Sequence, residues 1–74
     1  MSNQPQHNSG EHQAKIKKME QMITDTLDNV DKTEDAMKHA ESAAQIEALK
    51  EENANRLESV EDARREIEEE RSFL

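Results

Sequence analysis

Between Glu11 and Leu74 the chain contains neither glycine nor proline; its one glycine and its one proline both lie in the first ten residues. This stretch therefore has no glycine to take a positive φ angle without strain and no proline to kink a helix. It is rich in Ala, Glu, Lys, Gln, Met and Arg, whose side chains lose little conformational entropy when they enter a helix. Because no alternating strand pattern occurs, the chain after the tail is predicted to be helical or disordered.

The first eleven residues differ in composition from the rest. Pro5, Gly10 and four side-chain amides fall within the first ten positions, and no apolar periodicity is present there. Such a segment cannot bury enough apolar surface to offset the entropy of ordering it. Residues 1–11 are therefore predicted to form a disordered tail.

A first apolar stripe follows the tail. From Ile16 to Ala44, apolar and small side chains recur at alternating steps of three and four residues. This is heptad spacing, which predicts a helix with one continuous packing face, over about residues 12–40. The candidate packing residues of this face are Ile16, Met19, Ile23, Leu27, Val30 and Met37.

A second heptad series predicts another helix over about residues 43–69. Its candidate packing residues are Ile46, Leu49, Asn53, Leu57, Val60 and Ile67. Asn53 is the polar member of this series. A buried Asn can fix the register between two helices, and an Asn at the solvated rim of a loose hairpin has no such role. Both interpretations of Asn53 are open from the sequence.

The two stripes are out of phase. Ala44 and Ile46 are two residues apart, which is about 200° of rotation on one helix, so a single straight helix would turn the stripes to opposite sides. A break near Glu41 and Ser42 resolves this, and Ser42 with Gln45 has capping-box spacing. The predicted fold is all-α, an antiparallel two-helix hairpin with a marginal core and residues 71–74 frayed. One long helix or a coiled-coil dimer is the alternative.

Composition limits what such a hairpin can do. Leu, Ile, Val and Phe make up 11 of 74 residues, and the net charge is −8. This is too little apolar material for a large core, so an enzyme pocket is not expected. The three histidines lack the spacing that places two ligands on one helical face. We therefore expect no catalytic residue, no cofactor and no metal site.

Charge and hydropathy also restrict the partners. An acidic chain is repelled by phosphates, so we expect no nucleic-acid binding tighter than about 10⁻⁴ M. No apolar run reaches the roughly 18 residues that span a bilayer, so no membrane association is expected. The absence of cysteine excludes a disulfide framework, and we expect an intracellular protein. The predicted partners are a second copy of the chain or a helical protein, with no small-molecule substrate.

Acidic residues crowd the end of the second predicted helix at Glu66, Glu68, Glu69 and Glu70. Carboxylates so close to one another, and to the negative end of a helix dipole, are expected to have raised pKa values. On that basis helicity should increase as the pH falls from 7 toward 4.5.

The sequence resembles a known family in both halves. In the second half the matching positions are Asn53, Arg56, Ser59, Glu61, Arg64, Glu66 and Ile67. In the first half they are Met22, Thr26, Asn29, Val30, Glu34 and Met37. On these residues the chain resembles the small acid-soluble spore protein Tlp family, over roughly residues 15–70.

The resemblance implies a minor protein of endospore-forming bacteria, made during sporulation and held in the forespore or the dormant spore core. It would be non-enzymatic and serve as packing material or as an amino-acid store. The alternative is an acidic helical protein-protein interaction module that dimerises or binds a basic partner.

Overall fold

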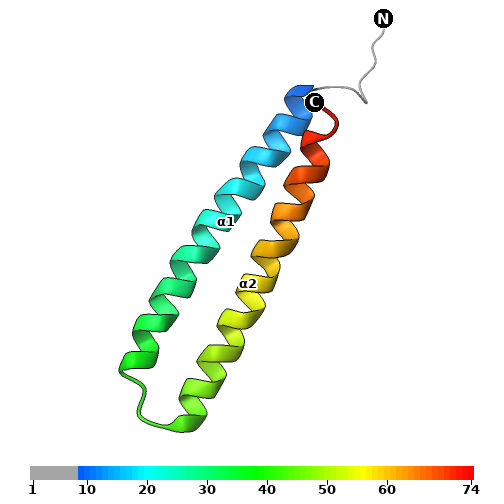
Figure 1. Cartoon of the computed structure of the whole chain (residues 1–74). Helices are drawn as coiled ribbons and strands as arrows, with labels where there is room; N and C mark the ends of the chain where they lie inside the picture. The colour runs from blue at the N-terminus through cyan, green and yellow to red at the C-terminus, as the bar shows by residue number, and fades with distance from the viewer. Residues whose placement is uncertain (1–8) are drawn as a thin grey trace, which may run out of the picture.

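A computed structural model of the chain describes residues 9–74. Helix α1 spans Ser9–Lys38 and helix α2 spans Ala43–Arg71. The two helices run antiparallel along their whole length, and the C-terminal end of the chain lies beside the start of α1 (Figure 1). This confirms the predicted all-α, two-helix hairpin, and the chain turns at residues 39–42 instead of continuing as one long helix.

Three of the four helix ends differ from those expected, by two or three residues. Helix α1 begins at Ser9, so residues 9–11, which the composition assigned to the tail, are its first turn, and residues 1–8 of the predicted tail lie outside the described residues. It ends at Lys38, two residues early. Helix α2 begins at residue 43 as expected and ends two residues late, at Arg71.

The turn between the helices is built without glycine. The His39 N–H donates to the Ala36 carbonyl at 3.0 Å, and the Ala40 N–H donates to the Met37 carbonyl at 3.3 Å. These i→i+3 bonds tighten the last turn of α1 and use carbonyls that the helix end leaves free. No residue of the described part of the chain has a positive φ angle. The turn therefore needs none of the conformations that favour glycine.

Ser42 caps the start of α2. Its backbone is extended, with φ −147° and ψ 156°, and its Oγ accepts a hydrogen bond from the Gln45 N–H at 3.1 Å. The Gln45 side chain reaches back and accepts from the Glu41 N–H at 2.8 Å, one residue before the usual partner in a capping box. Two free N–H groups are thus satisfied at the point where the sequence predicted a helix start.

The end of α2 stays ordered where fraying was expected. The Ser72 N–H donates to the backbone carbonyls of Glu68 and Glu69, both at 3.1 Å. The Ser72 hydroxyl also donates to the Glu69 carbonyl, at 2.6 Å. Further i→i+3 bonds continue from Phe73 and Leu74. These bonds satisfy carbonyls of the last turn, which explains why α2 continues to Arg71 despite the acidic residues there.

The core is a thin strip between the helices. Its buried apolar residues are Ile16, Val30, Val60, Ala63 and Ile67, and its buried polar residues are Thr33 and Asn53. No side chain in the described part of the chain is completely enclosed, and Val60, at 3% exposure, is the most buried. Neither α1 nor α2 contains an apolar run of the length that spans a lipid bilayer.

Candidate functional site

The candidate site is the packing seam, the line of side chains along which α1 and α2 meet. Every buried or half-buried residue of the described chain falls on it, at alternating steps of three and four within each helix. On α1 these are His12, Ile16, Met19, Ile23, Thr26, Val30, Thr33 and Met37, with Ala40 just beyond the helix; on α2 they are Ile46, Leu49, Asn53, Arg56, Val60, Ala63, Ile67 and Glu70. The seam is therefore a regular heptad interface.

Two of the twelve predicted packing residues lie outside the seam. Leu27 is 37% exposed and Leu57 is 45% exposed, whereas the other ten are buried or half-buried. Each leucine follows a seam residue directly, Thr26 in α1 and Arg56 in α2. One residue is a rotation of about 100°, which turns both leucines away from the facing helix.

A polar layer crosses the middle of the seam. The buried Asn53 side-chain amide donates from Nδ2 to the Val30 carbonyl oxygen at 3.1 Å. Arg56 Nη1 donates to Thr33 Oγ1 at 2.8 Å and to Asn53 Oδ1 at 2.9 Å. Every buried side-chain polar atom of the described residues has a partner. Of the two interpretations of Asn53, this geometry favours the register-fixing one, because a shifted register would break the bonds from Asn53 to Val30 and from Arg56 to Thr33.

Arg56 lies at the solvent-exposed edge of this polar layer. Its side chain is 31% exposed, and its Nη2 lies 3.7 Å from Oε1 of Glu52, one turn earlier on α2. The long side chain covers apolar surface while its guanidinium reaches the rim, where water still solvates part of the charge. A charged seam position is tolerated because the guanidinium donates to Thr33 and Asn53 without being fully buried.

The Val30–Asn53 hydrogen bond also defines the register of the hairpin. Moving seven residues back along α1 and seven residues forward along α2 keeps the two helices level. Ile23 then lies level with Val60, and the next step brings Ile16 level with Ile67. The most apolar levels of the seam are therefore those toward the open end.

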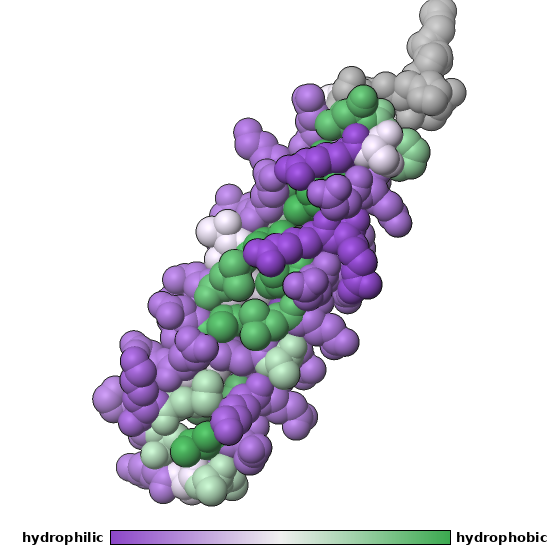
Figure 2. Space-filling view, in the orientation of Figure 1, coloured by the Kyte–Doolittle hydropathy of each residue, from purple (hydrophilic) through white to green (hydrophobic). Residues whose placement is uncertain are grey.

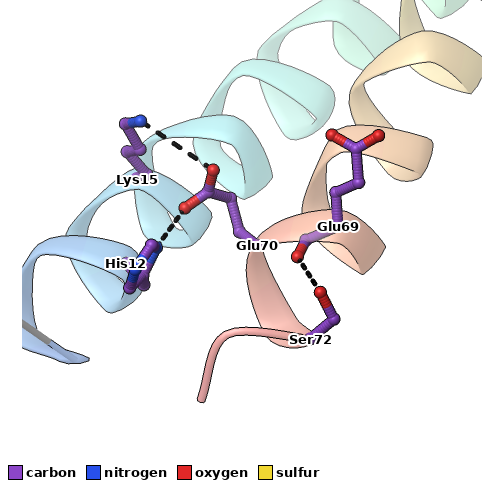
Figure 3. A network of polar contacts seen from close by, with 5 residues as sticks. All are labelled: His12, Lys15, Glu69, Glu70 and Ser72. Carbon is purple, nitrogen blue, oxygen red and sulfur yellow. Dashed lines mark hydrogen bonds and ion pairs between the residues drawn. The ribbon is translucent and has the colours of Figure 1, made fainter. Parts of the chain in front are cut away.

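A polar cluster closes the open end of the hairpin (Figure 3). His12 Nδ1 lies 2.6 Å from Glu70 Oε1, a distance at which the ring N–H donates to the carboxylate. Lys15 Nζ lies 3.8 Å from Glu70 Oε2, and the His12 ring stacks on Phe73 with centroids 5.0 Å apart. These contacts join the first turns of α1 to the end of α2.

The environment of Glu70 corrects an expectation from the sequence. The hydrogen bond from His12 lowers the pKa of Glu70; burial opposes this effect, and the charges of Lys15 and His12 support it. Crowding by neighbouring glutamates had predicted the opposite direction for this residue. The difference arises because Glu70 lies on the seam, facing the basic start of α1.

The sequence-based interpretation missed all three seam residues with ionisable side chains, His12, Arg56 and Glu70. Charged and titratable side chains are usually solvated, so they were not considered for the seam. The strict alternation of three and four steps from Asn53 passes through Arg56 and Glu70, and this spacing was the signal that could have found them.

The chemistry available at the seam is packing and hydrogen bonding. Among residues 9–74 no group of three or more His, Cys, Asp or Glu side chains is arranged to hold a metal ion. A groove beside the seam is lined by Glu20, Ile23, Arg64, Ile67 and Arg71. It combines apolar walls with an ion pair between Arg71 and Glu20 at 3.3 Å.

Comparison with known proteins identifies the family. The family model for the small, acid-soluble spore protein Tlp matches residues 8–73. The chain belongs to this Tlp family. Asn53, Val30 and Arg56, on which the sequence resemblance rested in part, form the polar layer, so family positions coincide with the feature that sets the register.

A curated relative supports the same assignment. The chain is 44% identical over 55 residues to a "Protein Tlp homolog" of Caldanaerobacter subterraneus subsp. tengcongensis. The aligned segment covers 70% of this chain and 66% of the relative, just under two thirds of the relative's length. No solved structure matches the chain. Family membership supports a role as a spore protein.

Proposed function

We propose that this Tlp-family chain is a minor, non-enzymatic protein of the dormant spore core, made during sporulation, where it serves as packing material or as an amino-acid store. The family match over residues 8–73 supports the association with spores. The acidic hairpin, with a net charge of −8, supports a role that does not involve coating DNA.

The observation that carries the storage role is the thin core. Val60, the most buried residue among those described, still keeps 3% of its surface exposed, and the other buried residues keep more. Local or global opening of so thin a core requires little free energy, and proteases cut the open form. A protein of this kind is easily degraded once water and proteases become active, which suits a store consumed at germination.

The test follows the protein through sporulation and germination. Immunoblots should detect it in sporulating cells and dormant spores and not during vegetative growth. If it is a store, isotope label in the protein should pass into new proteins as the chain disappears during germination. If it is packing material, the protein should persist, and its deletion should change the water content of the spore core. Steady vegetative expression would contradict both roles.

Variants connect this test to the structure. Ile67→Ala removes a buried side chain that is 6% exposed, and it should speed disappearance of the protein during germination if opening of the hairpin limits its degradation. Asn55→Ala, at an exposed position of α2, is the matched control and should disappear at the wild-type rate. Equal rates for all three proteins would mean that degradation does not depend on the thin core.

The second candidate function is an acidic helical interaction module that dimerises or binds a basic partner. The exposed apolar side chains Met22, Leu27 and Leu57 favour it, because isolated hairpins gain nothing from leaving them in water. Salt-sensitive binding to poly-lysine in calorimetry, together with expression during vegetative growth, would support this function over the spore-core role.

A further inference from the structure

Leu27 and Leu57 lie on the same long side of the hairpin. The ion pair between Glu20 and Arg71 crosses from α1 to α2 at 3.3 Å and marks that side. Leu27 lies seven residues after Glu20, and Leu57 lies fourteen residues before Arg71, so heptad geometry places both on the marked side. The register of the polar layer puts the two leucines level with each other.

We call this side the leucine face and define it by the heptad positions Glu20, Leu27 and Glu34 on α1 and Lys50, Leu57, Arg64 and Arg71 on α2. The exposed fractions of its two leucines are 37% and 45%. In the space-filling view, hydrophobic side chains gather over the middle of one face, between the two helices, with hydrophilic side chains around them (Figure 2). Covering such a patch would release the water ordered around it.

The charges around the leucines are separated by helix. On the leucine face α1 contributes only acidic charge and α2 only basic charge. One row further from the seam the signs are mixed: α1 carries Lys17, Asp31 and Lys38, and α2 carries Glu47, Glu61 and Glu68. This pattern is complementary to itself when α1 of one hairpin meets α2 of another.

We propose that a second copy of the chain covers the leucine face and completes a four-helix bundle. The two hairpins lie side by side with their turns at the same end, related by a two-fold axis parallel to the helices. Helix α1 of each copy then packs against α2 of the other, and Leu27 of each copy lies level with Leu57 of the other.

Charge complementarity selects this orientation. With the turns at the same end, residues of opposite charge lie level across the interface: Glu20 with Arg64, Glu34 with Lys50, Lys17 with Glu68, and Lys38 with Glu47. If the turns lay at opposite ends about an axis at Leu27, like charges would meet, with Glu20 facing Glu34 and Lys50 facing Arg64. Such like-charge pairs disfavour the second orientation.

The area of the face is sufficient for a stable dimer. Helix α1 has 30 residues and is therefore about 45 Å long, and two adjacent helices present a strip about 20 Å wide. That strip of about 900 Å² is close to the roughly 800 Å² that each partner buries in a standard interface. Four-helix bundles also pack through heptad positions of this kind.

Sedimentation equilibrium over a range of concentrations tests the proposal on the full chain. The expected mass is twice the 8.5 kDa of the single chain. Leu27→Glu combined with Leu57→Glu should weaken the dimer by about 100-fold or more, because apolar contacts are lost and charge is placed in the interface. Met22→Glu is the matched control: Met22 is 44% exposed but lines a groove with Ser59 and Glu66 on the opposite side, so the dimer should survive.

The double leucine variant adds two acidic groups to a thin hairpin and could unfold it. Exchanging the charges of one proposed ion pair tests the dimer interface independently. Glu34→Lys alone and Lys50→Glu alone should each weaken the dimer, and the two changes together should restore it, with helicity checked by circular dichroism. A wild-type chain that stays monomeric, or a dimer that is unchanged in the leucine and single charge variants, would overturn the proposal.

Pulsed electron paramagnetic resonance tests the orientation. A spin label on Glu41→Cys, in the exposed turn of this cysteine-free chain, should report a distance below about 25 Å between the two copies. Turns at opposite ends would place the labels about 40 Å apart, because each turn lies fourteen residues from Leu27. A distance near 40 Å would overturn the parallel arrangement.

Discussion

The half of the hairpin near the open end and the half near the turn are held together by different kinds of side chain. Toward the open end the buried seam residues are apolar: Ile16, Val60, Ala63 and Ile67. From the level just past Val30 to the turn, the buried seam residues are the polar Asn53, opposite Val30, and Thr33, and the apolar ones there are only half-buried.

The difference separates stability from specificity. Apolar burial is not directional, so sliding one helix by a heptad would still bring Ile against Val or Ile. The hydrogen bonds from Asn53 to the Val30 carbonyl and from Arg56 to Thr33 cross between the helices, and a heptad slip would separate both pairs. We infer that the open half supplies most of the stability and that the polar layer selects the register.

The largest expected effect comes from shortening a buried apolar side chain in the half of the hairpin near the open end. Ile67→Ala should lower the free energy of unfolding by about 2–4 kcal/mol, because it removes buried methyl groups and leaves a cavity. Ile46→Ala, at a half-buried seam position near the turn, should lower it by about 1 kcal/mol. Urea unfolding followed at 222 nm measures both. Equal losses would contradict the division between the two halves.

The next effect concerns the polar layer. Asn53→Ala leaves the Val30 carbonyl without its side-chain partner and removes one acceptor of Arg56, which should lower stability by about 1–3 kcal/mol. Asn55→Ala, two residues along on the exposed side of α2, is the control and should not destabilise the hairpin. The same unfolding assay applies. If the two alanine variants behaved alike, the polar layer would have no energetic role.

A smaller effect is expected at the turn. Ser42→Ala removes the oxygen that caps the Gln45 N–H and should lower stability by about 1 kcal/mol. Ser59→Ala, in the middle of α2 and exposed, should leave stability unchanged or slightly raised, since Ala favours helix. The melting temperatures of the two variants, measured by circular dichroism, make the comparison.

The smallest expected effect is the pH dependence of the contact at the open end. Because the pKa of Glu70 is lowered in the folded chain, its charged form stabilises the fold above the normal glutamate range, and that contribution is lost as the pH falls through the lowered pKa. The stability difference between wild type and Glu70→Gln should therefore shrink as the pH falls through the glutamate range, from about pH 5 to about pH 3. Glu69→Gln is the neighbouring control. A difference that grows over this range would contradict the lowered pKa of Glu70.

Heptad periodicity was sufficient to predict the architecture and most of the seam. The phase offset between Ala44 and Ile46 located the turn, and Ser42 with Gln45 located the start of α2. Leu27 and Leu57 were placed on the seam for their hydrophobicity, although the strict three-and-four alternation passes through Thr26 and Arg56 instead.

The polar contacts of the seam could not be predicted in the same way. Asn53 was a candidate for fixing the register, but its partner is a backbone carbonyl, which no side-chain pattern reveals. The pairing of His12 with Glu70 joins residues 58 positions apart, and it depends on where the antiparallel register brings the two ends together. These contacts follow from the tertiary arrangement and not from local sequence.

Solution NMR of the uniformly labelled chain tests the central claim most directly, because it reports the turn and the register together. The account predicts helical backbone shifts that end after Lys38 and resume at Ala43, with nuclear Overhauser effects from the Asn53 side-chain amide to Val30 and Thr33. Unbroken helical shifts through residues 39–42, or contacts that place Asn53 a heptad away from Val30, would contradict it.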